Sequence, residues 1–454
     1  MESLGLIQKY DDYQKTHMHS VENIPCGWNI LRFHDVFSFS KGLNITKENL
    51  QEDGIPCLNY GEIHSKFGFE LRPEIHSLKC VDEKYLKNNK KSILRFGDFI
   101  FADTSEDYEG AGNFTYLNSE DEIFAGYHTL ICRLKIGVNE RYLAYVVGSE
   151  AFRLQVRRAV KGVKVFSITQ GLLKGTKLWL ASEEEQTRIA NFLDKKTAQI
   201  DDAIAIKEQQ ISLLKERKQI IIQQAVTQGL DPNVPMKDSG VDWIGKIPAH
   251  WEVRRAKYIF DEVDERSKNG DEELLSVSHM TGVTPRSEKN VSMFMAEDYT
   301  GSKLCIENDL VINIMWAWMG ALGVSDRVGI VSPSYGVFRQ KLKNTFNPTY
   351  LEYLLKSVKY VEYYNKVSTG LHSSRLRFYG HMLFAMKMGY PSYEEQNEIM
   401  AYLHEQTKRI DVAIDSQLAQ IEKLKEYKTS LINSAVTGKI KITPEMVDGS
   451  SNAL

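Results

Sequence analysis

Apolar residues recur at alternating steps of four and three along two stretches of the chain, residues 182–229 and 392–439. This spacing is typical of a coiled-coil seam, so each stretch is predicted to be one long helix. Both stretches open with Ser-x-x-Glu, a pattern that predicts a capping box at the helix start. The predicted seam residues are Leu193, Ile200, Ile204, Ile211, Leu214 and Ile221 in the first helix, and Leu403, Ile410, Ile414, Ile421, Leu424 and Leu431 in the second.

The two stretches are copies of each other, because a shift of 210 residues repeatedly finds the same residue type. Polar residues also fall at matching seam positions: Thr197 and Thr407, Lys207 and Gln417, Lys218 and Lys428. Polar seam positions lower stability but select one register and one partner number. We therefore expect one defined pairing, and the simplest arrangement packs the two helices antiparallel within the chain.

Two globular stretches alternate with the helices, and an Ile-Pro-x-x-Trp motif opens each of them, at 24–28 and 247–251. Short runs of β-branched and aromatic residues predict several short strands in both. The expected fold class is α+β, with two mixed α/β domains separated by two long antiparallel coiled-coil helices in a pseudo-twofold repeat. The expected boundaries are an N-terminal extension (1–23), a first domain (24–181), a first helix (182–229), a connector (230–246), a second domain (247–391), a second helix (392–439) and a tail (440–454).

Composition places the chain among ordinary globular proteins, with 42% hydrophobic and 26% charged residues in 454. We expect no signal peptide, because the first residues are polar and acidic, and no membrane span, because the most apolar run is too short. The five cysteines lie far apart without a CxxC pair, which argues against a zinc site or a disulfide framework. This cysteine usage suits a reducing cytoplasm.

The net charge of -3 conceals two basic stretches. Residues 151–180 contain seven lysines and arginines without an acid, and residues 363–393 contain four without an acid. A solvated face is the alternative interpretation of any single basic run. Two such runs at equivalent places in two repeats favour a shared anionic partner, for which a phosphate backbone is the obvious candidate.

The helices match closely while the globular stretches have diverged, which suits two related modules that read different halves of a nucleic-acid site. In this layout, with Ile-Pro-x-x-Trp before each domain and Glu-Gln-x-x-Ile-x-x-x-Leu opening each helix, the chain resembles the specificity subunit of type I restriction-modification systems. The resemblance covers nearly the whole chain.

The resemblance implies that each domain is a target recognition domain that reads one half of a bipartite, asymmetric DNA sequence. It also implies that the helices set the spacer between the halves and help to dock two methyltransferase subunits. Two restriction (motor) subunits then join for defence against foreign DNA. The chain itself is expected to be non-catalytic and to bind no cofactor, with S-adenosylmethionine, ATP and Mg expected on the partner subunits.

Two other classes of function stay open from the residues alone: a coiled-coil scaffold that presents two adaptor domains without reading DNA, and an enzyme with an unrecognised site. Asn-Pro-Thr-Tyr at 347–350 superficially resembles a motif of adenine methyltransferases, but a helix entry is favoured there. No Walker motif, His-Glu-x-x-His motif or nucleophile elbow is present.

Candidate DNA contacts lie in the two basic stretches, because Lys and Arg clamp phosphates, Arg forks onto guanine, and Ser or His reaches other base edges. For each residue singly, a solvated surface position is the alternative. For Trp316 and Trp318 we expect core packing of at least one ring. The candidates are Arg157, Arg158, Lys161 and Lys164 in the first domain, and His372, Ser373, Ser374, Arg375 and Arg377 in the second.

Overall fold

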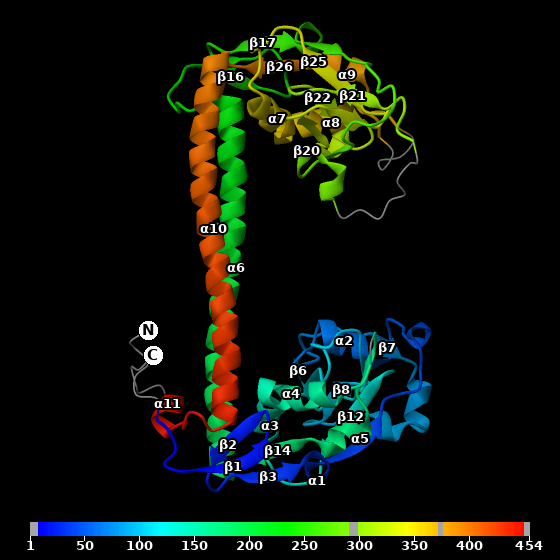
Figure 1. Ribbon diagram of the computed structural model, residues 1–454, viewed down its shortest axis with the longest axis vertical. Coiled ribbons are helices and arrows are strands. Elements are labelled where there is room, and N and C mark those ends of the chain that lie inside the picture. The colour runs from blue at the N-terminus through cyan, green and yellow to red at the C-terminus, as the bar shows by residue number, and fades with distance from the viewer. Residues whose placement is uncertain (1–7, 163, 290–297, 371–375, 449–454) are drawn as a thin grey trace. The chain divides into compact units, whose positions relative to one another are not determined.

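The computed structural model describes residues 8–162, 164–289, 298–370 and 376–448, and the chain forms two compact units (Figure 1). Unit 1 comprises residues 1–207 and 419–454, and unit 2 comprises residues 208–418. Each unit therefore contains one globular domain, part of the long helix that follows it, and part of the other long helix.

The two long helices are α6 (Glu183–Gln228) and α10 (Tyr393–Val436), close to the predicted stretches. In unit 1, Asp201 of α6 contacts Lys428 of α10, whereas Lys207, further along α6, contacts the earlier Gln420. The helices consequently run antiparallel there, side by side in Figure 1. In unit 2 the end of α6 packs against the start of α10 in the same antiparallel sense. The predicted fold class is confirmed.

The predicted seam positions lie on the faces that the two helices turn toward each other or toward the domains. Four of them are half-buried, namely Ile204, Leu214, Ile221 and Leu424, and the other eight are buried. Because burial of a leucine or isoleucine side chain contributes about 1.5–3 kcal/mol, this seam supplies much of the stability of the helix pair.

The polar seam positions pair in a pseudo-twofold manner. Lys218 Nζ lies 2.7 Å from both carboxylate oxygens of Asp411, and Lys428 Nζ lies 2.7 Å from both oxygens of Asp201. These are equivalent residues in the two copies. Sliding one helix past the other would separate both pairs, so they favour this register over its neighbours.

The first domain is built on a five-stranded sheet of order β4-β12-β8-β10-β6, which is mostly antiparallel. Helices α3 and α4 pack against this sheet, and a second sheet of order β11-β5-β7 lies beside it. The strands are β1 (Tyr13–Met18), β2 (Val21–Pro25), β3 (Asn29–Arg32), β4 (Phe37–Lys41), β5 (Ile55–Leu58), β6 (Glu70–Leu71), β7 (Cys80–Val81), β8 (Phe99–Ala102), β9 (Thr104–Ser105), β10 (Phe114–Leu117), β11 (Phe124–Ala125), β12 (Thr129–Leu134), β13 (Phe166–Ser167) and β14 (Lys177–Leu180). The helices are α1 (Phe33–Val36), α2 (Tyr60–Ser65), α3 (Glu140–Gly148), α4 (Glu150–Ala159), α5 (Gln170–Gly175) and, after α10, α11 (Pro444–Asp448).

The second domain repeats this plan with a four-stranded sheet of order β18-β25-β22-β23, equivalent to β4-β12-β8-β10 of the first. The paired strands β17 and β26 correspond to β3 and β14, and β15 and β16 correspond to β1 and β2. Its strands are β15 (Met236–Asp238), β16 (Lys246–Pro248), β17 (Glu252–Arg255), β18 (Phe260–Glu262), β19 (Leu275–Ser278), β20 (Gly282–Pro285), β21 (Lys303–Cys305), β22 (Leu310–Ile312), β23 (Leu322–Val324), β24 (Gly329–Val331), β25 (Gly336–Gln340) and β26 (Lys387–Tyr390). Its helices are α7 (Pro348–Lys356), α8 (Val358–Val367) and α9 (Gly380–Ala385).

The N-terminal extension is a structural counterpart of the connector, which its sequence does not suggest. Strand β1 of the extension pairs with β2 as β15 of the connector pairs with β16. Tyr13 Oη donates to the carbonyl oxygen of Gly438, just beyond the end of α10. In both copies, therefore, a short hairpin lies between the end of one long helix and the following domain.

We predict that Lys218→Glu lowers the free energy of unfolding by about 1 kcal/mol, because it replaces a half-buried ion pair with two like charges. Adding Asp411→Lys should restore most of the loss, since the pair is reformed in reverse. Denaturant titration of both variants measures this coupling as a double-mutant cycle. Lys215→Glu, at an exposed position of α6, is the matched control and should have little effect. Equal destabilisation in the single and double variants would contradict a role for the pair.

Candidate nucleic-acid interface

Each domain is joined to the start of its long helix by the tryptophan of its Ile-Pro-x-x-Trp motif. Trp28 Nε1 donates to Glu185 Oε2 at 3.2 Å in unit 1, and Trp251 Nε1 donates to Glu395 Oε1 at 3.0 Å in unit 2. Both indole side chains are buried, and a hydrogen bond to a carboxylate is stronger than one between neutral groups. The two short motifs recur in the sequence because they contact each other in the fold.

The predicted capping boxes form only in part. The backbone N–H of Glu185 donates to Ser182 Oγ at 3.4 Å, and that of Glu395 donates to Ser392 Oγ at 3.3 Å. The glutamate carboxylates, however, accept from the tryptophans instead of from the serine backbone N–H groups. A glutamate at this helix position suits either partner, so the local pattern could not distinguish them.

The glutamine after each of these glutamates binds the start of a domain helix, α3 in unit 1 and α7 in unit 2. Gln186 Oε1 accepts from the backbone N–H of Asn139 at 3.0 Å, and Gln396 Oε1 accepts from that of Asn347 at 2.8 Å. Asn139 and Asn347 are the N-caps of α3 and α7, and Pro348 is the first residue of α7. The predicted helix entry at 347–350 is therefore confirmed.

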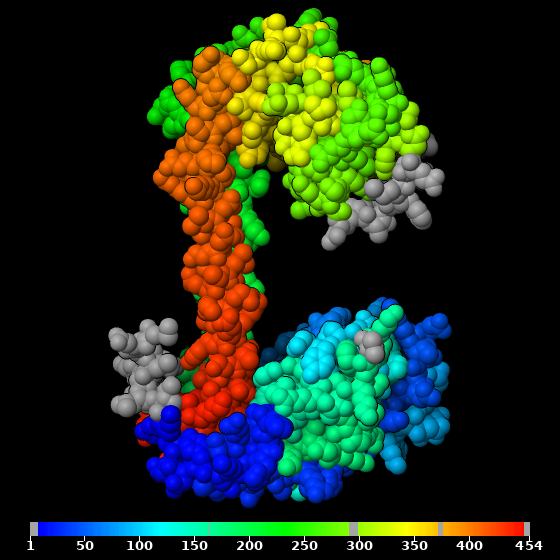
Figure 2. Space-filling model, viewed as in Figure 1, coloured from blue at the N-terminus to red at the C-terminus, as the bar shows by residue number. Residues whose placement is uncertain are grey.

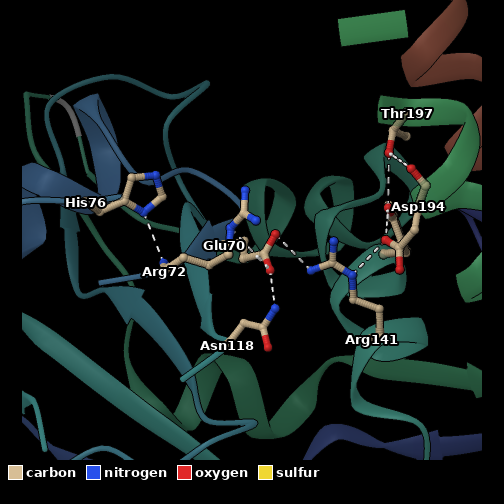
Figure 3. A network of polar contacts seen from close by, with 8 residues as sticks. Glu70, Arg72, His76, Asn118, Arg141, Asp194 and Thr197 are labelled. Carbon is tan, nitrogen blue, oxygen red and sulfur yellow. Dashed lines mark hydrogen bonds and ion pairs between the residues drawn. The ribbon is translucent and has the colours of Figure 1, made fainter. Parts of the chain in front are cut away.

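Unit 1 has a further polar connection, centred on Arg141 of α3 (Figure 3). Its Nε donates to Asp194 Oδ1 of α6 at 2.8 Å, and its Nη1 lies 3.1 Å from Glu70 Oε2 of β6. Tyr145 Oη also donates to Asp194 Oδ1, at 2.6 Å, and lies 3.2 Å from Thr197 Oγ1. The network thus ties the edge of the domain sheet to the long helix.

This network lines an open cleft of about 940 Å³ between the first domain and the helices of unit 1. Burial lowers the pKa of Arg141, but the carboxylates of Asp194 and Glu70 raise it more, so the guanidinium stays charged. The equivalent positions in unit 2 are Thr349 and His404, which cannot form the same pair. The ionic connection is therefore particular to unit 1.

An ion pair between a buried aspartate and a half-buried arginine holds the central strands of each domain together and was not anticipated from the sequence. Asp98, before β8, accepts from Arg133 of β12 at 2.6 and 2.8 Å. Asp309, before β22, accepts from Arg339 of β25 at 2.8 Å twice. Because these pairs occupy equivalent strands, they align the loops that follow β8 and β22 as structural counterparts.

The predicted DNA contacts of the first domain do not all lie at the surface. Arg157 is buried, and its Nη1 lies 2.7 Å from Glu150 Oε1 and 3.2 Å from Glu109 Oε2. Its charge is compensated within the domain, so we leave it out of the proposed interface. Arg158, Lys161 and Lys164 are exposed, and they follow one another through the end of α4 and the loop before β13.

This basic loop borders a hollow of about 520 Å³ in the first domain. Strand β13 pairs with β9, which brings the basic loop against the loop 104–109 that follows β8. His64 of α2 lies within hydrogen-bonding distance of the Thr104 carbonyl oxygen and of Asn113, both at 2.8 Å. Sequence reasoning missed the hollow because its lining comes from five separate segments, each unremarkable by itself.

The predicted DNA contacts of the second domain lie mostly outside the described residues. Outside the described residues are His372, Ser373, Ser374 and Arg375. Arg377 is described: its side chain is half-buried, and its backbone pairs with that of Thr369. The backbone N–H of Phe378 donates to the carbonyl oxygen of Ile314 at 3.0 Å, as that of Ile168 donates to Asp103 at 2.8 Å in the first domain.

Both domains therefore place the same two loops side by side: the loop after β8 or β22, and the loop after α4 or α8. In the first domain the former carries Glu106, Asp107 and Glu109, whereas in the second it carries Trp316 and Trp318. The expectation of core packing for one tryptophan is wrong, because Trp316 is exposed, Trp318 is half-buried, and neither belongs to an apolar core cluster.

Comparison with known proteins shows what this chain is similar to. Residues 25–216 match the model of the type I restriction modification DNA specificity domain. Over these residues the chain resembles the DNA specificity domain of type I restriction-modification systems. The match runs through the first domain and into α6, the segment that the Trp28–Glu185 contact connects.

Two curated specificity subunits resemble this chain over almost its full length, both from Methanocaldococcus jannaschii. The putative MjaX subunit is 23% identical over 449 residues, which covers 96% of this chain and 98% of the relative. The MjaVIII subunit is 24% identical over 462 residues, with the same coverage of 96% and 98%. The resemblance predicted from the sequence is thus confirmed.

Two solved structures have the same fold. One comes from work on complex assembly and conformational transition of the type I R-M system; it is 16% identical with a TM-score of 0.65, and covers 92% of this chain and 99% of that chain. The other is the HsdS subunit from Thermoanaerobacter tengcongensis, 16% identical with a TM-score of 0.53, and covers 92% and 98%.

Other kinds of site find little support in the part of the chain that the structure describes. There, no group of three or more histidine, cysteine, aspartate or glutamate residues could hold a metal ion. No described helix is both long and apolar enough to cross a bilayer. The five cysteines are unpaired, and four of them are buried.

We predict that Arg141→Ala lowers the free energy of unfolding of this protein by about 1–3 kcal/mol, because it removes the cation that Asp194 and Glu70 share. Chemical denaturation measures the change. Arg188→Ala is the matched control: Arg188 is also paired, with Glu184 one turn away on α6, and its loss should cost only about 0.5 kcal/mol. Equal effects of the two substitutions would show that the network does not connect the domain to α6.

Proposed function

We propose that this chain is the non-catalytic DNA-recognition subunit of a type I restriction-modification complex. Each domain reads one half of a bipartite, asymmetric DNA site. The observation that carries the proposal is the pair of equivalent loops beside the basic segments, which differ in chemistry between the two domains. Carboxylates accept from cytosine amino groups, whereas an apolar ring contacts a thymine methyl group, so the two loops suit different base pairs.

The basic segments supply the sequence-independent part of binding in this proposal. Arg158, Lys161 and Lys164 of the first domain and Arg377 of the second lie next to the loops that differ. Phosphate contacts position a protein on the duplex, and base contacts specify the sequence. His372, Ser373, Ser374 and Arg375 stay in the proposed contact set on sequence grounds alone.

The long helices set the spacer and dock two methyltransferase subunits, with two restriction subunits joining the complex in the cytoplasm. The docking role is supported by the exposure of the helix surface: on the face drawn in Figure 2, the side chains of α10 are open to view. In unit 2, exposed apolar residues occur on both helices: Leu213 and Ile220 on α6, and Val412 and Leu418 on α10. Exposed apolar side chains on a helix pair are typical of a surface that another helix covers.

The proposal predicts that the domains are exchangeable units of recognition. Replacing residues 24–181 with the corresponding domain of a relative should change one half of the methylated sequence and leave the other unchanged. Sequencing of methylated sites in a genome that carries the intact system gives the result. The reciprocal control replaces residues 247–391 and should change the other half. A change in both halves after either exchange would contradict independent reading.

A second prediction separates DNA recognition from the scaffold alternative. Lys161→Ala with Lys164→Ala should weaken DNA binding by the assembled methyltransferase and reduce the slope of log affinity against log salt by about 2, because each phosphate contact contributes about 0.9. Lys161→Arg with Lys164→Arg keeps both charges and should keep the slope. Absent or salt-insensitive binding by the unmodified complex would favour the scaffold.

A further inference from the structure

Trp316 is the one exposed tryptophan among the six in the chain, all of which lie in the described part. Its exposed fraction is 46%, whereas Trp28, Trp179 and Trp251 are at most 3% exposed. The ring of Trp316 stacks on that of Trp318, with centroids 5.9 Å apart and planes at 28°. Together with Met319, which is 39% exposed, the pair forms an apolar patch on the loop after β22.

The loop is held by hydrogen bonds that keep the patch in place. The backbone N–H of Trp316 donates to the Asn313 carbonyl oxygen at 3.0 Å, and that of Ala321 donates to the Trp316 carbonyl oxygen at 3.2 Å. Asn313 Nδ2 also donates to Tyr335 Oη at 2.9 Å. Gly320, with φ 82°, closes the loop in a conformation that favours glycine. The indole is therefore presented before any partner binds.

Trp318, on which the Trp316 ring stacks, is itself held by hydrogen bonds. Trp318 Nε1 donates to the carbonyl oxygen of Met315 at 3.1 Å, and Asn365 Nδ2 of α8 donates to the carbonyl oxygen of Trp318 at 2.9 Å. These bonds satisfy Trp318 within the domain. The Trp316 ring, stacked on that of Trp318, stays exposed.

The surroundings of the patch favour DNA over an apolar protein partner. The Phe378–Ile314 backbone hydrogen bond places the loop directly beside Arg377, the residue before Phe378. Residues 310–325 carry no charge and residues 363–393 contain no acid, so nothing in these two segments repels a phosphate backbone. The equivalent loop of the first domain lies beside Lys161 and Lys164 in the same way.

We infer that Trp316 is a specificity-determining residue of the second domain and that its indole contacts a thymine methyl group in the half-site which that domain reads. The inference rests on the proposed function, and it names one residue that reads the DNA, Trp316, and the base that this residue contacts, thymine. An uncharged apolar surface cannot read guanine by a forked hydrogen bond, whereas the C5-methyl group of thymine is the apolar feature of the major groove. Glu106 and Asp107 of the equivalent loop would read a different base.

The test is a double cycle between Trp316→Ala and the removal of single thymine methyl groups. Each thymine of the mapped second half-site is replaced in turn by deoxyuridine, and affinity is measured with the assembled methyltransferase. For the unmodified protein, one replacement should weaken binding about fourfold, the value of one buried methyl group. For Trp316→Ala, the same replacement should have no effect, because the contact is already lost.

Tyr108→Ala is the matched control, since Tyr108 is the exposed aromatic residue of the equivalent loop in the first domain. It should keep the full deoxyuridine effect in the second half-site. Trp316→Phe should retain part of the effect. In addition, DNA should protect the unmodified complex from acrylamide quenching of tryptophan fluorescence more than it protects the Trp316→Phe complex.

The outcomes separate the inference from the proposed function. If Trp316→Ala leaves affinity, mapped sequence and quenching unchanged while exchange of residues 247–391 alters the second half, the inference is overturned and the function stands. If Trp316→Ala weakens binding equally on thymine and deoxyuridine substrates, the thymine contact is overturned. If the unmodified complex shows no sequence-specific binding, the proposed function itself fails.

Discussion

The contact on which the rest of this structure depends is the hydrogen bond from a buried tryptophan to the first-turn glutamate of a long helix. It occurs twice, as Trp28 with Glu185 and as Trp251 with Glu395. With the neighbouring glutamine, it fixes both the entry strand and the helix α3 or α7 of each domain on the coiled coil. The tryptophan bonds are charge-assisted, and together with the glutamine bonds they hold each domain in a fixed orientation on its long helix.

The same constraint explains which parts of the two copies match. Residues in the seam and in the central strands of the domains meet the same partners twice. Lys218 with Asp411 repeats Lys428 with Asp201, and Asp98 with Arg133 repeats Asp309 with Arg339. The loops after β8 and β22 share an equivalent backbone hydrogen bond, but their side chains differ in chemistry. The repeated scaffold thus carries loops of different chemistry, which is how function varies when a fold stays the same.

Unit 1 and unit 2 are nevertheless unequal in how the domain is held. Arg141 connects β6 and α3 to Asp194 of α6 in unit 1, and unit 2 has Thr349 and His404 at the corresponding positions. The extra network adds charge-assisted bonds beside a cleft where apolar packing is incomplete. The pseudo-twofold repeat thus describes the backbone and the joints better than it describes the polar contacts around them.

Periodicity and repetition in the sequence determined the two helices, their seam and the alternation of domains, because these depend on spacing along the chain. Local patterns also identified the helix entry at Asn347 and the basic segments. Only the tertiary structure decided that the Glu185 carboxylate accepts from Trp28 and not from the backbone N–H of Ser182, that Arg157 is buried against Glu150, and that Trp316 is exposed. Each of these depends on residues distant in sequence or on neighbouring elements that pack around it, and a side chain's partner there is set by packing, which no local pattern records.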